Sequence, residues 1–500
     1  MPYKIVGVDD AGDFPPRVEN RLAEKVADSE DPVGAAVASL ARAAIDSVTL
    51  LASAHGVVGD GVTDSGAALN DLLATAAQQG ASVTLDAGST VFTTAKVVVP
   101  SGTRLHGNGA TIKSGIADLY TPTIELANVD NVFIEDLTIN GDKATSAGTT
   151  EHKHGLTMNT ASRVTLRNVA SINNKGDGYY LRGDNAGSCC ETVVLDNCFA
   201  NGNHRNGLSV ISARAVRVNG GAYSSQIGTA PESGIDIEPN LTVDVVEDVE
   251  LNGVTMADNA GPGFQAILVA ASSQGGIRVR GGRIAGNVGG ALHRDSVGTF
   301  FEGVDIEDND TYGVSFTGVC RTARITGGRV RRNGHRGIDA IMAGGSLTDF
   351  AALGVEVTDN SQATPNTYDG IRAEGTVSGF KIAFCKVGNT GGGGTQRYGL
   401  TTSATVTNEA YVGNDWSGNA TGPIVYGGQA ASRLRIDPDL IQAPAMQTVG
   451  GLRVGTTLRL DAPGTSTTAP AAGAAGALPA TPAGYFTVNI GGTTRVVPYY

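Results

Sequence analysis

The sequence predicts an all-β protein, a right-handed, single-stranded parallel β-helix with three short strands in each coil. The first observation is a phrase that recurs through most of the chain: a glycine, an apolar residue, any residue and a second apolar residue. It begins, for example, at Gly155, Gly178, Gly207 and Gly234, so that successive phrases start 23, 29 and 27 residues apart. A repeat of about 20 to 50 residues is typical of stacked coils. Alternation inside the phrase is typical of a strand that buries one face.

Two further observations agree with stacked coils. A second alternating run follows each phrase, as in Val164-Thr165-Leu166. An asparagine often precedes the next glycine by four residues, and because asparagine tolerates a left-handed backbone we expect the corners of the coils there. A doubly wound α/β sheet would instead need a helical pattern between the strands, which the intervals lack. The asparagines at this position are Asn174, Asn203, Asn259, Asn309 and Asn333.

Composition limits the class of partner. The net charge is −13 and the pI is near 5.0, which argues against nucleic acid or an anionic membrane as the main partner. The chain has no run of about 18 apolar residues and no signal-peptide core behind Met1. We therefore expect no membrane insertion, and synthesis in the cytosol or export without a cleaved signal. The five cysteines form no CxxC pair, so we expect small buried strand residues.

The chain divides into five regions. Residues 1–53 are polar and then amphipathic, with apolar residues at spacings of three and four from Val37 to Leu51, which predicts a helix packed on the body or a short trimer-forming neck. Residues 54–430 hold the predicted β-helix. The remaining regions are a short strand-like stretch at 431–461, an Ala-, Pro-, Gly- and Thr-rich linker at 462–484, and a β-hairpin around Gly491-Gly492 at 485–500.

The first part of the β-helix carries a family resemblance. The phrase Ala54-His55-Gly56-Val57-Val58-Gly59-Asp60-Gly61-Val62-Thr63-Asp64 is followed by an amphipathic stretch from Ala67 to Gln79, which Gly80 closes. This order resembles the pectate-lyase-like superfamily, and within it the N-terminal part of phage tailspikes and glycan depolymerases. The resemblance implies that the helix caps the open end of the solenoid, where an unpaired first coil would expose a sheet edge and the core.

Both ends of the chain resemble phage structural proteins. The ending from Ala477 to Tyr500 is similar to the C-termini of minor tail proteins from phages of actinobacteria. This resemblance implies a virion tail component, assembled in the host cytoplasm, that attaches to tail or baseplate proteins through its N-terminal region, forms a homotrimer and binds a bacterial surface glycan. Three classes stay open: a depolymerase acting by hydrolysis or β-elimination, a receptor-binding or structural tail protein without chemistry, and a bacterial polysaccharide lyase or epimerase.

We expect the chemistry on outward strand positions, since the inward ones are apolar. Stacking brings equivalent positions of neighbouring coils to about 4.8 Å, so that Tyr180, Arg182 and Gln265 are predicted to line a sugar groove. Asp236 and Glu238 are the predicted catalytic pair, with Cα atoms about 6.6 Å apart, a separation that slightly favours inverting hydrolysis. With Ser209 and Gln265 rather than a cation as neighbours of Asp236, one acid of the pair is expected to stay protonated. The alternative is a solvated outer face.

A second group of side chains is the alternative acid–base site. His152, His154, Asp177 and His204 are expected at corners close to the first phrases, where they would suit lyase or epimerase chemistry. The alternative for them is ordinary loop polarity. His152 and His154 supply only two metal ligands, and the acidic run Asp305–Asp310 matches no calcium loop. The sequence therefore predicts neither a metal site nor a cofactor.

Overall fold

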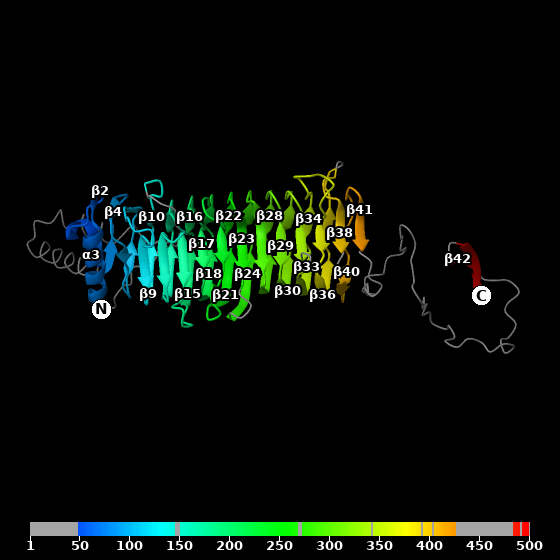
Figure 1. Cartoon of the computed structure of the whole chain (residues 1–500), viewed down its shortest axis with the longest axis horizontal. Helices are drawn as coiled ribbons and strands as arrows, with labels where there is room; N and C mark the ends of the chain where they lie inside the picture. Colours follow the sequence, from blue (N-terminus) through cyan, green and yellow to red (C-terminus); the bar gives the residue numbers. More distant parts are fainter. Residues whose placement is uncertain are drawn as a thin grey trace, which may run out of the picture. The chain divides into compact units, whose positions relative to one another are not determined.

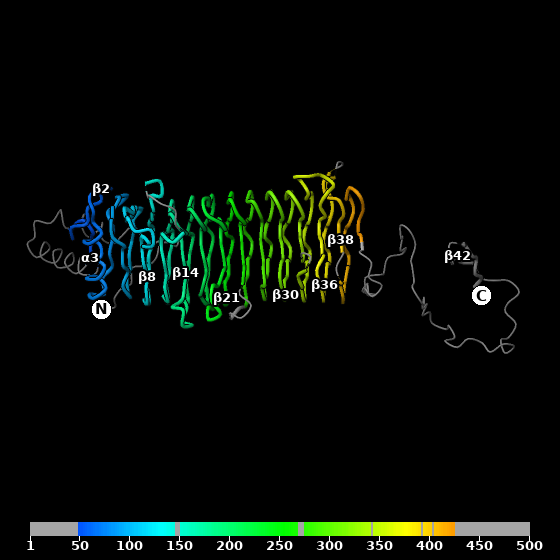
Figure 2. The backbone as a smooth tube through the Cα atoms, in the orientation of Figure 1, coloured from blue at the N-terminus to red at the C-terminus, as the bar shows by residue number. Residues whose placement is uncertain are grey.

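The computed structural model describes residues 49–145, 151–268, 273–341, 344–391, 394–402 and 405–426, together with the strands at 484–490 and 493–499. From Thr49 to Tyr426 the chain winds into a stack of coils (Figure 1, Figure 2). Every strand in the stack pairs in parallel with strands of neighbouring coils, and three long sheets result. This arrangement confirms the predicted parallel β-helix with three short strands per coil.

The third sheet carries the glycine phrases. The phrase beginning at Gly155 forms β11, after which the chain passes through the first and the second sheet before it returns to the third as β14. Within the described residues this sheet runs β5 (Val97–Val98), β8 (Ile124–Ala127), β11 (Leu156–Asn159), β14 (Tyr179–Arg182), β17 (Leu208–Val210), β20 (Ile235–Ile237), β23 (Pro262–Ile267), β26 (Gly289–Arg294), β29 (Val314–Thr317), β32 (Ile338–Ile341), β35 (Ile371–Ala373), β38 (Tyr398–Thr402) and β41 (Gly422–Tyr426).

The first sheet carries the second alternating run of each repeat. Its described strands are β1 (Thr49–Leu51), β3 (Ser82–Thr84), β6 (Arg104–His106), β9 (Asp130–Glu135), β12 (Ser162–Arg167), β15 (Cys190–Asp196), β18 (Ala213–Asn219), β21 (Val245–Asn252), β24 (Ser273–Arg280), β27 (Val297–Glu302), β30 (Val319–Thr326), β33 (Ser346–Leu353), β36 (Thr376–Ala383) and β39 (Thr405–Thr407), with β40 (Ala410–Val412) also paired to β36. The predicted helix up to Leu51 is wrong at its last residue, because Leu51 lies in strand β1. Residues 1–48, which hold the rest of that prediction, lie outside the described residues.

The second sheet closes each coil. Its described strands are β2 (Asp60–Asp64), β4 (Thr90–Thr93), β7 (Thr111–Ser114), β10 (Thr138–Asn140), β13 (Ala170–Ile172), β16 (Phe199–Asn201), β19 (Ala222–Ser224), β22 (Thr255–Ala257), β25 (Arg283–Ala285), β28 (Asp305–Glu307), β31 (Arg329–Arg331), β34 (Glu356–Thr358) and β37 (Lys386–Gly388). The acidic run that begins at Asp305 lies here. Glu307 pairs with Arg331 at 2.8 Å and Asp308 pairs with Arg332 at 2.7 Å. Ion pairs with arginines of the next coil therefore neutralise these two acidic residues.

The interior follows the predicted alternation. Ile235 and Ile237 of β20 are fully buried and belong to one apolar core that runs through the coils. The outward residue between them, Asp236, pairs with Ser209 on one side and Gln265 on the other. The register predicted from the glycine phrases is therefore confirmed, because a shift by one residue would bring Asp236 into the core.

The predicted helical cap is present. Helix α3 (Gly66–Gln79) follows the short 3-10 helix η1 (Ala52–His55) and strand β2, and it lies at the N-terminal end of the stack (Figure 1). Leu69, Leu72 and Leu73 point into the core, and Gly80 ends the helix with a left-handed φ of 67°. The carboxylate of Asp64 accepts a hydrogen bond from the backbone N–H of Gly66 at 3.1 Å, which fixes the start of α3.

The recurring asparagines lie inside the corners, and their backbone is not left-handed. The residue before each one takes that conformation instead, as Asn173 (φ 53°) and Asp308 (φ 56°) show. The asparagine side chains are buried, and the Oδ1 atoms of Asn203, Asn309 and Asn333 each accept from both the backbone N–H and Nδ2 of an asparagine in the preceding coil. Asn309 Oδ1, for example, accepts from Asn287 N and Nδ2 at 3.1 and 3.0 Å. The predicted corner conformation is thus wrong by one residue, because the amide ladder needs an ordinary backbone at the asparagine.

The end of the chain forms a separate small unit within residues 441–500. Strands β42 (Gly484–Ile490) and β43 (Thr493–Tyr499) pair antiparallel, with Ile490 opposite Thr493, as the predicted hairpin requires. The strand-like stretch at 431–461 and most of the linker at 462–484 lie outside the described residues. No helix among the described residues is long and apolar enough to span a membrane.

Candidate functional site

The outer face of the third sheet is enclosed around β11 to β20, contrary to the solvated surface that the alternative interpretation required. Thr157 is 7% exposed, and Ser209 and Asp236 are 0% exposed. The side chain of Asn206, in the corner before β17, donates from Nδ2 to Ser209 Oγ at 3.0 Å and to Asp236 Oδ2 at 2.9 Å. Corner side chains therefore fold back over the strands, which a strand periodicity does not reveal.

Asp236 is held by two amides. Asn206 Nδ2 donates to one carboxylate oxygen, and Gln265 Nε2 donates to the other at 3.1 Å. Burial raises the pKa of Asp236 well above its usual value, Glu238 raises it further, and Arg205 acts in the opposite direction. The expectation of a cation-free neighbourhood was wrong with respect to Arg205. The direction of the pKa shift nevertheless agrees with the prediction that one acid of the pair stays protonated.

Arg205 links the carboxylates of the site. Its guanidinium lies 3.2 Å from Glu151 through Nε, 3.2 Å from Asp177 through Nη1 and 3.4 Å from Glu238 through Nη2. The Arg205 side chain is 14% exposed and that of Asp177 is fully buried, whereas Glu238 is 30% exposed. Burial alone would lower the pKa of Arg205, but Asp177 and Asp236 reverse this and raise it. One cation therefore faces four carboxyl groups.

His154 and Tyr180 form the aromatic side of the site. Their rings stack with centroids 4.2 Å apart and an interplanar angle of 5°. His154 Nδ1 accepts a hydrogen bond from the backbone N–H of Asp177 at 3.0 Å. Burial, followed by the charge of Arg205, holds the pKa of His154 well below its ordinary range, so its ring is neutral. Burial also raises the pKa of Asp177 and brings that of Tyr180 to about 12.

The two predicted sites thus converge into one, which we name the Arg205 cluster. It comprises Glu151, His154, Asp177, Tyr180, Arg205, Asp236 and Glu238. Gln265 lies at its edge through the bond to Asp236, and the charge of Arg182 reaches His154. The rings of His152 and His154 lie edge to face, with their centroids 6.4 Å apart.

His204 does not belong to the Arg205 cluster. Its Nε2 lies 3.1 Å from Thr229 Oγ1, and its pKa is lowered by burial and by Lys175. The side chain therefore points away from its sequence neighbour Arg205. Both residues lie in a bend between β16 and β17, where strand alternation does not determine the direction of a side chain, and this accounts for the error.

Sequence reasoning missed Arg205 and Asn206. Both precede the glycine of their phrase, and the hydrogen bonds of their backbone continue the ladder: Arg205 N–H donates to Gly176 O at 3.3 Å, and Asn206 O accepts from Gly178 N–H at 2.9 Å. The signal was present in the sequence, because the equivalent residues Asp177, Asn206 and Ser233 stand directly before successive phrase glycines. Extending the alignment of the repeats two residues toward the N-terminus would have brought Arg205 and Asp177 beside the Asp236 row.

The arrangement suits proton transfer better than metal binding. Asp177 and Asp236, whose pKa values burial raises, lie in one group with the more exposed carboxyl groups of Glu151 and Glu238. Carboxyl groups in such different environments are the usual basis of acid–base chemistry. Among the residues that the structure describes, no three His, Cys, Asp or Glu side chains are placed to hold a metal ion. Of the cluster, Glu151 (42% exposed) and Glu238 are the carboxylates that a ligand can reach directly.

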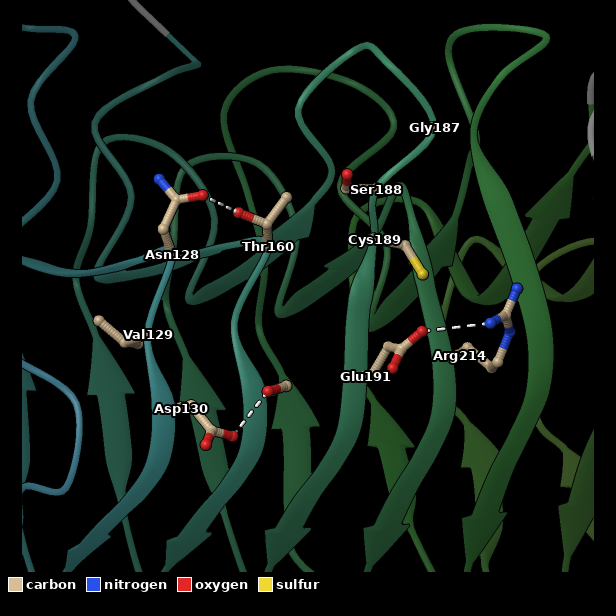
Figure 3. Close-up of a pocket in the computed structure, with 10 residues that line it drawn as sticks. Asn128, Val129, Asp130, Thr160, Gly187, Ser188, Cys189, Glu191 and Arg214 are labelled. Carbon is tan, nitrogen blue, oxygen red and sulfur yellow. Dashed lines mark hydrogen bonds and ion pairs between the residues drawn. The ribbon is translucent and has the colours of Figure 1, made fainter.

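A separate hollow lies where the chain leaves the third sheet after β8, β11 and β14 (Figure 3). Its volume is about 510 Å³, and polar groups dominate its lining. These groups satisfy one another: Thr160 Oγ1 donates to Asn128 Oδ1 at 2.6 Å, and Arg214 Nη1 lies 3.1 Å from Glu191. No residue predicted for the site lines this hollow, and none of its carboxyl groups is buried as Asp236 is.

Comparisons with known proteins identify relatives by structure. No protein-family model matches the chain, and no curated protein matches its sequence. The A-module of the Azotobacter vinelandii mannuronan C-5 epimerase AlgE6 aligns with 78% of this chain and 99% of its own, at 14% identity and a TM-score of 0.51. The tailspike gp49 of Acinetobacter baumannii bacteriophage Fri1, titled a capsular polysaccharide depolymerase, covers 77% of this chain and 65% of its own, at 14% identity and a TM-score of 0.47.

The fold is shared. At 14% identity the likeness to the epimerase module extends to the β-helix and to nothing finer. It agrees with the pectate-lyase-like architecture that the segment from Ala54 to Gly80 resembles. The function must therefore be argued from the Arg205 cluster itself.

Proposed function

We propose that the protein is a phage tail protein that binds a bacterial surface polysaccharide along the outer face of the third sheet and cleaves it at the Arg205 cluster. The observation that supports this most strongly is the burial of Asp177 and Asp236 around a single arginine on the outside of a solenoid. Burying charged groups costs free energy, and an outer face without a function has no need of such buried groups. Perturbed carboxyl groups of this kind concentrate at functional sites.

The reaction that the geometry favours is hydrolysis of a glycosidic bond. Asp236, whose pKa burial raises, is assigned as the general acid, and Glu238, whose carboxyl group lies 3.4 Å from Arg205 Nη2, as the general base that activates water. Tyr180 supplies a ring on which a sugar can stack, and Arg182 and Gln265 supply donors for its hydroxyl groups. Because Gln265 covers Asp236, a sugar must displace the amide to reach the acid.

A second function, receptor binding without chemistry, has an observation in its favour. Asp177 and Asp236 are 0% exposed and accept hydrogen bonds on their oxygens, so both carboxyl groups are fully satisfied in the free protein. In that case the cluster would shape a rigid binding face rather than transfer protons. Trimer formation and attachment through residues 1–53 belong to this proposal equally, because both functions suit a tail protein.

The test is release of reducing ends from capsule or cell-wall polysaccharides of candidate actinobacterial hosts. We expect the parent to release them, and Glu238→Gln and Asp236→Asn to lose at least about a hundredfold in rate. Glu302→Gln is the matched control, since that glutamate pairs with Arg280 at 2.9 Å on the first sheet. Equal rates of reducing-end release in the parent and in both variants would show that Asp236 and Glu238 are not the catalytic pair. Binding without release would favour the receptor-binding function, and an unsaturated, ultraviolet-absorbing product would indicate β-elimination.

A further inference from the structure

A second group of charged and aromatic side chains lies on the outer face of the third sheet, at β32 to β38. Arg372 donates from Nε and Nη2 to the two oxygens of Asp339 at 3.1 and 2.6 Å. Its Nη1 lies 2.7 Å from Glu374, and its side chain is 9% exposed. Arg397 donates in the same bidentate manner to Asp369, at 2.8 and 3.0 Å. Both arginines are therefore engaged by carboxylates.

Arg336 differs from these two arginines. It lies in the corner before β32, where its guanidinium stands 5.0 Å from the centre of the Tyr368 ring. Its Nε is buried and has no hydrogen-bond partner among the residues that the structure describes. Burial, and then the charge of Arg372, lower the pKa of Arg336, so the nearby carboxylates do not compensate its charge.

An unsatisfied buried donor costs free energy, and it costs more when the group is charged. Asp339 and Asp369 cannot relieve Arg336, because Arg372 and Arg397 already occupy their oxygens. A guanidinium presents a planar fork of donors that matches a carboxylate, sulfate or phosphate group. The guanidinium of Arg336, with its unpartnered Nε above an aromatic ring, therefore fits an anionic group that arrives with a ligand.

The position of Arg336 relates it to the Arg205 cluster. The third sheet runs β20, β23, β26, β29, β32, so Asp236 and Asp339 are four strand steps apart, about 19 Å at the usual strand spacing. The residues in register between them are Gln265, Leu292 and Ser315, which carry no charge, and the exposed Arg294, two residues farther along β26, lies 3.5 Å from Asp295. A chain of several sugars lying along this face would reach both places.

We propose that Arg336, over Tyr368, binds the anionic group of an acidic polysaccharide, so that the ligand of this face is an acidic rather than a neutral glycan. The inference rests on the proposed polysaccharide binding and adds the substrate class. The excess of carboxylates in the Arg205 cluster fits this placement, since an anionic group is repelled there and accepted four coils farther along.

Affinity electrophoresis of the full-length protein tests the inference. The gels contain polygalacturonate (carboxylate), chondroitin sulfate (carboxylate and sulfate), wall teichoic acid (phosphate) or dextran (neutral). We expect retardation by at least one acidic polymer and none by dextran, and at least a tenfold weaker binding of that polymer by Arg336→Gln. Arg278→Gln is the matched control, because Arg278 stands 5.5 Å from the centre of the Phe300 ring on the first sheet. If Arg336→Gln lowers the melting temperature, Arg336→Lys, which keeps the charge and loses the fork, replaces it with the same expectation.

The outcomes separate this inference from the proposed hydrolysis. Retention by no acidic polymer, equal retention by dextran, or an Arg336 variant that binds like the parent overturns the inference. Release of reducing ends from a neutral glycan would support the proposed hydrolysis and contradict the proposal of an acidic ligand. Arg336-dependent binding of an acidic polymer, with no release of reducing ends from any glycan, would support the acidic ligand and contradict the proposed hydrolysis.

Discussion

Asp236 is fully buried next to Glu238, and burial followed by the charge of Glu238 raises its pKa, whereas Arg205 and the hydrogen bond from Gln265 lower it by less. The environment therefore favours the neutral acid. This charge state is what the proposed mechanism requires of a general acid, and it also has a consequence for stability.

The first prediction concerns Asp236→Asn. A carboxyl whose pKa is raised on folding costs stability as pH rises above its unfolded value of 3.8, so the amide variant should unfold at a higher temperature than the parent at pH 7. The gain should be at least about 1 kcal/mol, since one pKa unit corresponds to about 1.4 kcal/mol, and it should vanish below pH 4. Calorimetry across this pH range checks it. A variant less stable than the parent at pH 7 would show that Asp236 is ionised and stabilising.

His293 is a second buried group whose charge state can be tested. It takes an inward place in β26, between Phe264, Phe301 and Phe316, and both ring nitrogens are without a hydrogen-bond partner among the described residues. Burial lowers its pKa from 6.5 to about 3, so folding requires the neutral ring. Stability should be lost as pH falls from about 6.5 toward 3, because the unfolded chain binds the extra proton.

The second prediction follows from this sign. The parent should lose about 2–3 kcal/mol more stability than His293→Leu between pH 7 and pH 4.5. Thermal unfolding at a series of pH values measures the difference, with the exposed His55→Gln variant as the control that should keep the parent profile. Identical acid sensitivity in the parent and in His293→Leu would contradict the burial of a neutral imidazole.

At the scale of elements, the asparagine side chains of successive coils form a row of hydrogen bonds, which we call the asparagine ladder. This ladder stabilises the corners between the second and third sheets. Asn309 donates from Nδ2 to Ile284 O at 3.2 Å and to Asn333 Oδ1 at 2.9 Å, while its own Oδ1 serves Asn287. All three asparagines are 2% exposed or less. Each amide thus satisfies polar groups of two neighbouring coils that have no access to water.

The third prediction is that Asn309→Ala destabilises the protein by about 2–4 kcal/mol, because it leaves buried donors and acceptors in two coils without partners. The matched control is Asn201→Ala, whose exposed amide donates to Ser224 Oγ at 3.0 Å and should cost less than about 0.5 kcal/mol. Denaturant or thermal unfolding of both variants provides the comparison. A loss of similar size in both would mean that the ladder contributes no more than a surface amide.

The elements show which parts of the structure were predictable. The strand alternation from Gly155 to Gly234 fixed the inward set, and the pairing of Ser209 with Asp236 followed from it, because one face of each strand must be apolar. The orientation of corner side chains did not follow, because the corner residues lie in bends that do not continue the alternation of the strand. Arg205 was missed and His204 was misplaced for this reason, although they are adjacent in sequence.

At the scale of the whole molecule, α3 covers the N-terminal end of the β-helix, and the homotrimer that we propose would cover the other end. The fourth prediction is therefore a stable homotrimer of the full-length chain. Light scattering at micromolar concentration should give about three times the chain mass of 50.8 kDa. A mass of one chain over that concentration range would contradict the trimer.

The central claim is that the outer face of the third sheet binds polysaccharide. A crystal structure of the Asp236→Asn protein with an oligosaccharide of the glycan it binds tests this most directly. We predict that the sugar lies along the face from β14 to β35, stacked on Tyr180 and in contact with Glu238, with an anionic group at Arg336. An oligosaccharide bound instead over the first or second sheet, with this face unoccupied, would contradict the claim.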